Sequence, residues 1–308
     1  MADELTTLGI AVGGAFATKE TLNKLLGPTA DYLGEGAKDL VKKSTQNLGK
    51  IFSAACHKVK EQLDKKGQVS PRVLKSVWDE GRFVEDTIVA EYFGGLLACS
   101  RSEDGSDDGM LPHLSLIKTM SSGQLRLHYV VYSLVASLPF GREKPAHPEL
   151  FDGLVITIQS NELLAAMCSA GACDDRSVFQ AILGLVDLGL LESRYAFSMG
   201  LLHKQCGSLP VLSGQTVLCP NRKGADLFLK ALGFRGLDSE IITSVVTEDH
   251  LTDSVKQGIR LPCDFKYAHI LFSDSVESIH NDLKTMIGEV EDEVENLKSE
   301  LDDRTTFQ

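Results

Sequence analysis

The stretch that decides the fold is NELLAAMCSAGACDDRSVFQAILGLVDLGLLESR, residues 161–194. Its apolar spacing predicts a short helix over 161–169, a turn around Gly171 and a second helix over 176–188. Gly189 suits the left-handed backbone that ends a helix, and the apolar pair at 190–191 would then start a strand. Two helices followed by a two-stranded β-wing are typical of a winged-helix domain.

The sequence after this stretch supports the same interpretation. It predicts a glycine-containing hairpin, a returning strand at 215–218 and a third helix over 221–232 that closes on Gly233. Three prolines between 139 and 148 mark a boundary on the other side. We therefore expect a winged-helix-like domain over 150–270 with a small β-wing.

The chain before residue 138 predicts an N-terminal helical domain, 1–138. It opens with small residues, and Gly9 and Gly13 lie four apart, a spacing that lets two helices approach closely and favours self-association. The segment 76–99 predicts buried helices, and 111–138 predicts further ones. The acidic loop EDGSDDG, 103–109, lacks the ligand spacing of an EF-hand and is interpreted as a plain exposed loop.

A basic amphipathic helix is predicted over 37–66, with apolar residues on one stripe. Such a helix can lie on an anionic membrane surface or meet an acidic partner. The alternative is a solvated lysine face on a helix packed against its own domain. The lysines assigned to the binding face are Lys42, Lys43, Lys50 and Lys58.

The C-terminal stretch 273–304 predicts an acidic, coiled-coil-like helix whose apolar residues recur three or four apart. A monomer would leave this stripe exposed, so the chain is predicted to form a homo-oligomer. Together these segments give a mainly α fold. The residues assigned to oligomerisation here are Val290, Val294 and Leu297.

Charge is distributed unevenly along the 308 residues, whose formal net charge is −12. Between Lys38 and Lys75 there are ten basic residues against three acidic ones, whereas Asp274 to Asp303 holds eleven acids against two lysines. The acidic helix could dock on the basic helices, or the two could be solvated faces that never meet. The overall balance makes DNA an unlikely general partner.

The sequence predicts no enzyme, cofactor or catalytic residue, because it contains no phosphate-binding loop, dinucleotide-binding glycine motif, nucleophile elbow or zinc-protease helix. Neighbours in a helix point about 100° apart, which argues against a Cys56–His57 nucleophile pair. The best metal candidates are His203, Cys206 and Cys219, with Cys168 or Cys173 as a fourth ligand. The favoured alternative is a wing histidine with small buried thiols, and no metal. A cryptic metal enzyme remains a rival interpretation.

The helix that would read DNA in a winged-helix domain is residues 174–187, with three aspartates and one arginine. Phosphates would repel such a helix, so we favour a structural or protein-docking module. A DNA-binding transcriptional regulator is the alternative, because basic residues on or beside the wing could touch a DNA backbone. These residues are Arg194, Lys204, Arg222 and Lys223.

Several short segments resemble the abortive infection alpha (Abi-alpha) family of bacterial proteins. They are GPTADYLGE at 27–35, the basic helix at 42–66, SPRV at 70–73, EYFGGLLA at 91–98, LGLLE at 188–192 and the helix start at 223–228. The resemblance covers roughly residues 25 to 235 and implies defence against phage by halting growth of the infected cell. The family has no agreed catalytic residues, so none is transferred to this chain.

Localisation is predicted from the N-terminal segment. The uncharged run from Leu5 to Thr18 follows acidic residues and is shorter than the roughly 20 apolar residues of a membrane-spanning helix. We therefore expect a cytoplasmic protein that could associate peripherally with the inner membrane.

Overall fold

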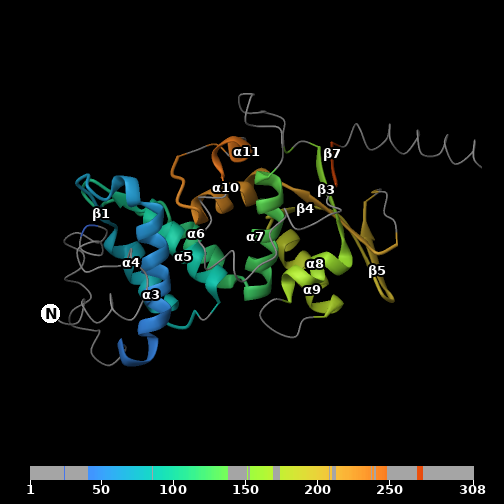
Figure 1. The fold of residues 1–308 in the computed structure, drawn as a ribbon, viewed down its shortest axis with the longest axis horizontal. Coiled ribbons are helices and arrows are strands. Elements are labelled where there is room, and N and C mark those ends of the chain that lie inside the picture. Colours follow the sequence, from blue (N-terminus) through green and yellow to red (C-terminus); the bar gives the residue numbers. More distant parts are fainter. Residues whose placement is uncertain are drawn as a thin grey trace, which may run out of the picture.

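The structure is a computed structural model that describes residues 24, 41–84, 86–137, 151, 153–168, 174–207, 209, 213–236, 238, 241–247 and 269–272. Its described part consists of helices with two small antiparallel sheets (Figure 1). The first half contains α3 (Val41–Lys58), η2 (Lys60–Gln62), α4 (Pro71–Gly81), α5 (Thr87–Cys99), α6 (Leu111–Thr119) and α7 (Ser122–Ala136). Two short strands, β1 (Gln68–Val69) and β2 (Arg101–Ser102), pair antiparallel beside them.

Helix α5 lies at the centre of this half, and every residue from Ile88 to Cys99 is buried. Two adjacent glycines allow its neighbours to come close. A Cβ on Gly94 would lie 2.7 Å from the Cβ of Ala54 in α3, and one on Gly95 would lie 1.9 Å from the carbonyl oxygen of Ala231. Any side chain at Gly95 would therefore collide with the backbone of the C-terminal half.

The second half contains β3 (Leu154–Gln159), α8 (Ser160–Met167), α9 (Asp175–Asp187), β4 (Leu191–Met199), β5 (Leu202–Cys206), β6 (Gln215–Pro220), α10 (Arg222–Ala231), α11 (Ile242–Val245) and β7 (His269–Phe272). The two predicted helices, the hairpin, the returning strand and the third helix are confirmed as elements, whereas the predicted turn around Gly171 lies outside the described residues. The sheet is larger than the expected wing, because it has five antiparallel strands in the order β5-β4-β6-β3-β7.

Short polar side chains fix where the helices begin. Asp174 caps α9 by accepting a hydrogen bond from the Ser177 N–H, and Asn221 caps α10 by accepting one from the Gly224 N–H. The helix ends follow the prediction too, since Gly189 and Gly233 have φ values of 65° and 90°. Both lie in the left-handed region that glycine adopts without strain.

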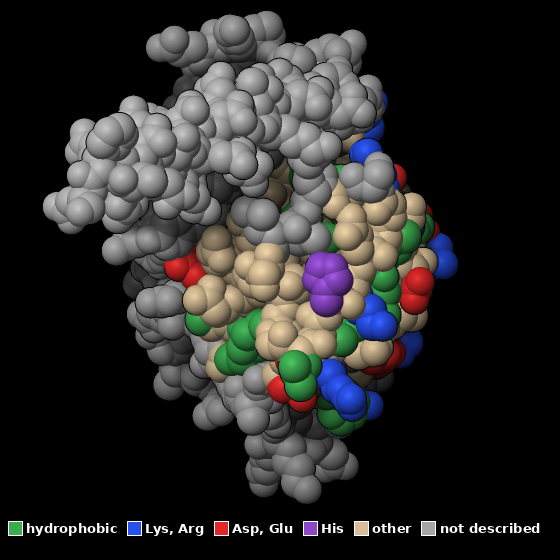
Figure 2. All heavy atoms as spheres, turned by 90° about the vertical axis from the view of Figure 1, so that its right-hand side faces the viewer, with side chains coloured by type: hydrophobic (Ala, Val, Ile, Leu, Met, Phe, Trp, Pro, Cys, Tyr) green, Lys and Arg blue, Asp and Glu red, His purple; other side chains and the backbone are tan. Residues whose placement is uncertain are grey.

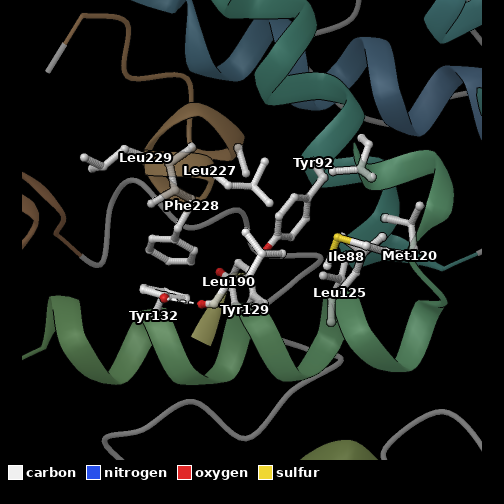
Figure 3. Close-up of a cluster of buried hydrophobic side chains, with 14 of the residues drawn as sticks. Ile88, Tyr92, Met120, Leu125, Tyr129, Tyr132, Leu190, Leu227, Phe228 and Leu229 are labelled. Atoms are coloured by element: carbon white, nitrogen blue, oxygen red, sulfur yellow. Dashed lines mark hydrogen bonds between the residues drawn. The ribbon is translucent and has the colours of Figure 1, made fainter. Parts of the chain in front are cut away.

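One continuous cluster of buried side chains runs from Leu48 in α3 to Ile242 in α11, across the predicted domain boundary. The two halves are joined by α7, which contacts α9 and α10. Tyr132 of α7 donates a hydrogen bond to the Leu190 carbonyl (2.6 Å) and accepts one from the Asn221 N–H (3.0 Å). Figure 3 shows this cluster, with the tyrosines of α7 directed toward Phe228 and Leu190.

Candidate interaction surface

The outer side of α9 is acidic. Its inner side packs into the core through Val178 and Ile182, while Asp174, Arg176 and Asp187 are exposed. The Ser177 N–H and hydroxyl bond the Asp174 carboxylate at 2.8 and 2.6 Å, and these bonds lower the pKa of Asp174. The carboxylate that starts the helix is thus held in its charged form, which opposes the approach of a phosphate.

The basic residues around the β4–β5 hairpin differ in how free they are to bind a phosphate. The ammonium group of Lys223 donates to the Leu188 carbonyl at 2.5 Å and so satisfies the C-terminal end of α9. Lys204 is exposed on β5 and Arg194 is half-buried on β4. Figure 2 shows the side of the molecule on which β5 lies, where acidic and basic side chains are interspersed.

The three metal candidates do not converge. His203 and Cys206 lie three residues apart in β5, so their side chains point to opposite faces of the sheet. Cys219 lies on β6, which is separated from β5 by β4. No group of three His, Cys, Asp or Glu side chains that could hold a metal occurs among the described residues. The proposed fourth ligand Cys173 lies outside them, while Cys168 follows α8.

Burial makes three of the thiols poor nucleophiles. It raises the pKa of Cys56 and of Cys99 to about 12 and that of Cys219 to about 11. A thiol needs a lowered pKa to react as a thiolate near neutral pH. These side chains therefore act as small apolar residues. The expectation of a small buried thiol is met by Cys219, whereas Cys206 is exposed.

The predicted lysine face requires one correction. Lys50 is exposed, but the Lys58 side chain is only 1% exposed and forms an ion pair with Glu91 of α5. Lys58 is therefore not available to a membrane surface. Lys42 and Lys43 belong to α3, but their side chains lie outside the described residues. So do all the residues assigned to oligomerisation: Gly9, Gly13, Val290, Val294 and Leu297.

The ion pair occupies a crowded junction that the sequence analysis missed. The Cβ of Lys58 lies 2.8 Å from where a Cβ of Gly233 would be, so α3, α5 and the end of α10 meet there. A buried charge is stable only when it is paired. The signal was Glu91 itself, a carboxylate in the middle of the apolar run of α5, which required a cation from another helix.

A second buried polar group lies between α5 and α7. The Tyr92 hydroxyl is hydrogen bonded to Nδ1 of His128, whose ring centroid is 4.5 Å from that of Tyr132. Desolvation lowers the pKa of His128 to about 3, against an opposing effect of the Gly224 backbone. His128 is therefore neutral near pH 7 and contributes to packing.

The acidic loop is held by arginines. Asp107 pairs with Arg235 at 2.6 Å, and Asp108 pairs with Arg72. Asp104 accepts hydrogen bonds from the Ser106 N–H at 3.1 Å and the Ser106 hydroxyl at 2.8 Å. Asp107 and Asp108 thus fasten the loop to the segment after α10 and to α4, while Asp104 holds the loop internally.

No family model, curated protein or solved structure matches this chain. Within the described part, no helix combines the length and the apolar character needed to cross a membrane.

Proposed function

We propose that this chain is a non-enzymatic antiphage defence protein whose winged-helix-like part docks a protein. The resemblance to the Abi-alpha family supports the defence role. The observation that carries the docking role is the acidic outer side of α9, with Asp174, Asp175 and Asp187 against Arg176. A helix of this charge loses the phosphate attraction on which DNA affinity depends.

The order of elements supports a winged-helix-like architecture for this part. Helices α8 and α9 precede strand β4, and β6 returns between β4 and β3. In winged-helix proteins the second helix and the wing form the contact surface. Here that surface is the one between α9 and the β4–β5 hairpin.

We further propose that the defence protein acts by self-assembly in the cytoplasm, with the C-terminal acidic coiled coil as the assembly element. The lysines that remain candidates for an anionic membrane surface are Lys42, Lys43 and Lys50.

Plating a panel of phages on cells that produce the chain tests the defence role. We expect cultures to survive infection at low multiplicity and to collapse at high multiplicity, because abortive infection sacrifices the infected cell. Unchanged phage yield and culture growth at both multiplicities, across the panel, would reject the defence role.

The alternative is a DNA-binding transcriptional regulator, favoured by the basic residues Arg194, Lys204 and Arg222 on or beside the hairpin. Retention on heparin or duplex DNA at low salt, with affinity that falls steeply as salt rises, would support it. We expect the chain instead to bind heparin and duplex DNA weakly.

A further inference from the structure

A strip of apolar side chains lies between α9 and the β4–β5 hairpin. The ring centroid of Phe179 in α9 is 6.1 Å from that of Tyr195 and 5.9 Å from that of Phe197, both in β4. Residues 195, 197 and 199 share one face of the strand, and Met199 pairs with Leu202 of β5. Phe197 is buried beneath this layer, whereas the other four side chains are half-buried.

The turn of the hairpin places an exposed apolar side chain directly before Leu202. Leu201, which follows Gly200 at the turn, is fully exposed. Phe83, which follows α4 in the first half, is 71% exposed. Among the described residues it is the only other large apolar side chain that is exposed. A single exposed apolar side chain is ordinary, but Leu201 adjoins Leu202 and with it the half-buried layer, which makes this end of the hairpin a candidate interaction site.

Carboxylates border the strip along α9. A carboxylate oxygen of Asp175 lies 3.6 Å from where a Cβ of Gly200 would be, which brings the start of α9 against the hairpin turn. At the other end, Asp187 is close enough to Tyr195 to help raise the pKa of that phenol, after burial and Cys206. Because α9 and its N-cap Asp174 together have three aspartates and Arg176, this border has a formal net charge of −2 (one minus three). The strip's one basic neighbour in the hairpin is Lys204, opposite Phe197 in β5.

We propose that this apolar strip docks a segment of a partner protein that carries a large apolar side chain beside a lysine or arginine. The apolar side chain would cover the aromatic layer, and the basic group would lie against the α9 border. Protein interfaces combine such an apolar centre with a polar rim, whereas nucleic acid requires basic groups. The strip consists of Phe179, Tyr195, Met199, Leu201 and Leu202.

The dimensions suit a short peptide. Tyr195 to Met199 spans four residues of strand, about 13 Å, and Asp175 to Asp187 spans twelve residues of helix, about 18 Å. Four or five extended residues, or three helical turns, would fit along it. The inference deepens the proposed function, because it rests on the docking role and names the surface and the partner's chemistry.

Selection of a random dodecapeptide library on the full-length chain tests this chemistry. Leu201→Asp places a charge on the exposed turn without disturbing the core, and Asp187→Lys reverses the border. Phe83→Asp is the matched control, because it puts the same carboxylate in place of an exposed apolar residue elsewhere. Peptide affinities are then measured by fluorescence anisotropy, with circular dichroism to verify that each variant is folded.

We expect enriched peptides to combine an aromatic or aliphatic residue with a nearby lysine or arginine. Their affinity should fall at least tenfold with Leu201→Asp and with Asp187→Lys, and should not change with Phe83→Asp. No enrichment, an acidic consensus, or affinities unaffected by both strip variants would overturn the inference. Duplex DNA binding that is lost in Leu201→Asp would assign the surface to nucleic acid instead. Phage protection by a chain that fails the peptide test would leave the defence role standing, and absent protection would reject that role separately.

Discussion

Replacing Gly95 by alanine should force α5 and α10 apart. The added Cβ would lie 1.9 Å from the Ala231 carbonyl oxygen, at least 1 Å closer than the roughly 3 Å that real contacts reach, and no side-chain rotation can relieve a backbone clash. Overpacking costs about 1–3 kcal/mol, and the upper value applies where backbone must move. Alanine returns about 1 kcal/mol of helix propensity. The net loss is therefore about 2 kcal/mol.

Urea unfolding followed by circular dichroism measures this loss, and the melting temperature should fall by roughly 4–8 °C. Gly123→Ala is the matched control, since a Cβ there would meet only the Ser121 hydroxyl, at 3.8 Å. That variant should gain up to about 1 kcal/mol from helix propensity. If Gly95→Ala proved as stable as the wild-type chain, the close approach of α5 and α10 would be refuted.

Three further predictions concern charge, acid stability and assembly. Lys58→Met should cost about 3 kcal/mol of unfolding free energy, because it leaves Glu91 buried without its cation. Lys50→Met, at an exposed position, should change the unfolding free energy by less than about 0.5 kcal/mol. Equal effects of the two variants in denaturant titrations would contradict the buried ion pair. The pKa of His128 is about 3 in the fold against an ordinary value of 6.5. As the pH falls the unfolded chain therefore takes up a proton first, and the free energy of unfolding should fall by roughly 2 kcal/mol between pH 6.5 and 5. His128→Gln should flatten this pH dependence, and an unaltered slope would contradict the buried neutral histidine. Finally, replacing Val290, Val294 and Leu297 of the C-terminal stripe together by serine should yield smaller species in sedimentation. An unchanged sedimentation profile would reject the assembly role.

Local sequence signals were sufficient for the helices of the second half of the fold. Helix caps at Asp174 and Asn221 and glycines at 189 and 233 fix where α9 and α10 begin and end, so both helices were predictable. Each of these signals lies within a few residues of the element it limits. They therefore need no knowledge of distant contacts.

Strand β3 was not predicted, for a physical reason. Its sequence LVITIQ is buried on both faces at its start, and the alternation of buried and half-buried residues begins only at Ile156 and lasts four residues, which is a short signal. Its partners β6 and β7 lie far along the chain, so no hairpin signal precedes or follows it. The extra strands of the sheet depend on these long-range pairings.

The candidate surface was predicted in part. The acidic character of α9 can be read from its composition, but the strip requires knowing that Phe179 covers β4 and that Leu201 is at an exposed turn. In the same way, helical spacing placed Lys58 on a lysine face, whereas the crossing of α3 over α5 buries it against Glu91. Spacing shows which side of a helix a residue occupies, and only the packing shows what covers that side.

Phage plating efficiency on cells that produce paired variants tests the protein-docking account most directly. One variant, Arg194→Glu with Arg222→Glu, reverses two basic groups that DNA binding would use and that lie outside the strip. Lys204 is left intact because it lies opposite Phe197 on the strip's face, and Lys223 because it supports the end of α9. The other is Leu201→Asp in the apolar strip. The account predicts that the charge-reversed wing still protects cells as the wild-type chain does and that Leu201→Asp loses protection. Loss of protection in the wing variant, with full protection by Leu201→Asp at equal expression, would contradict it.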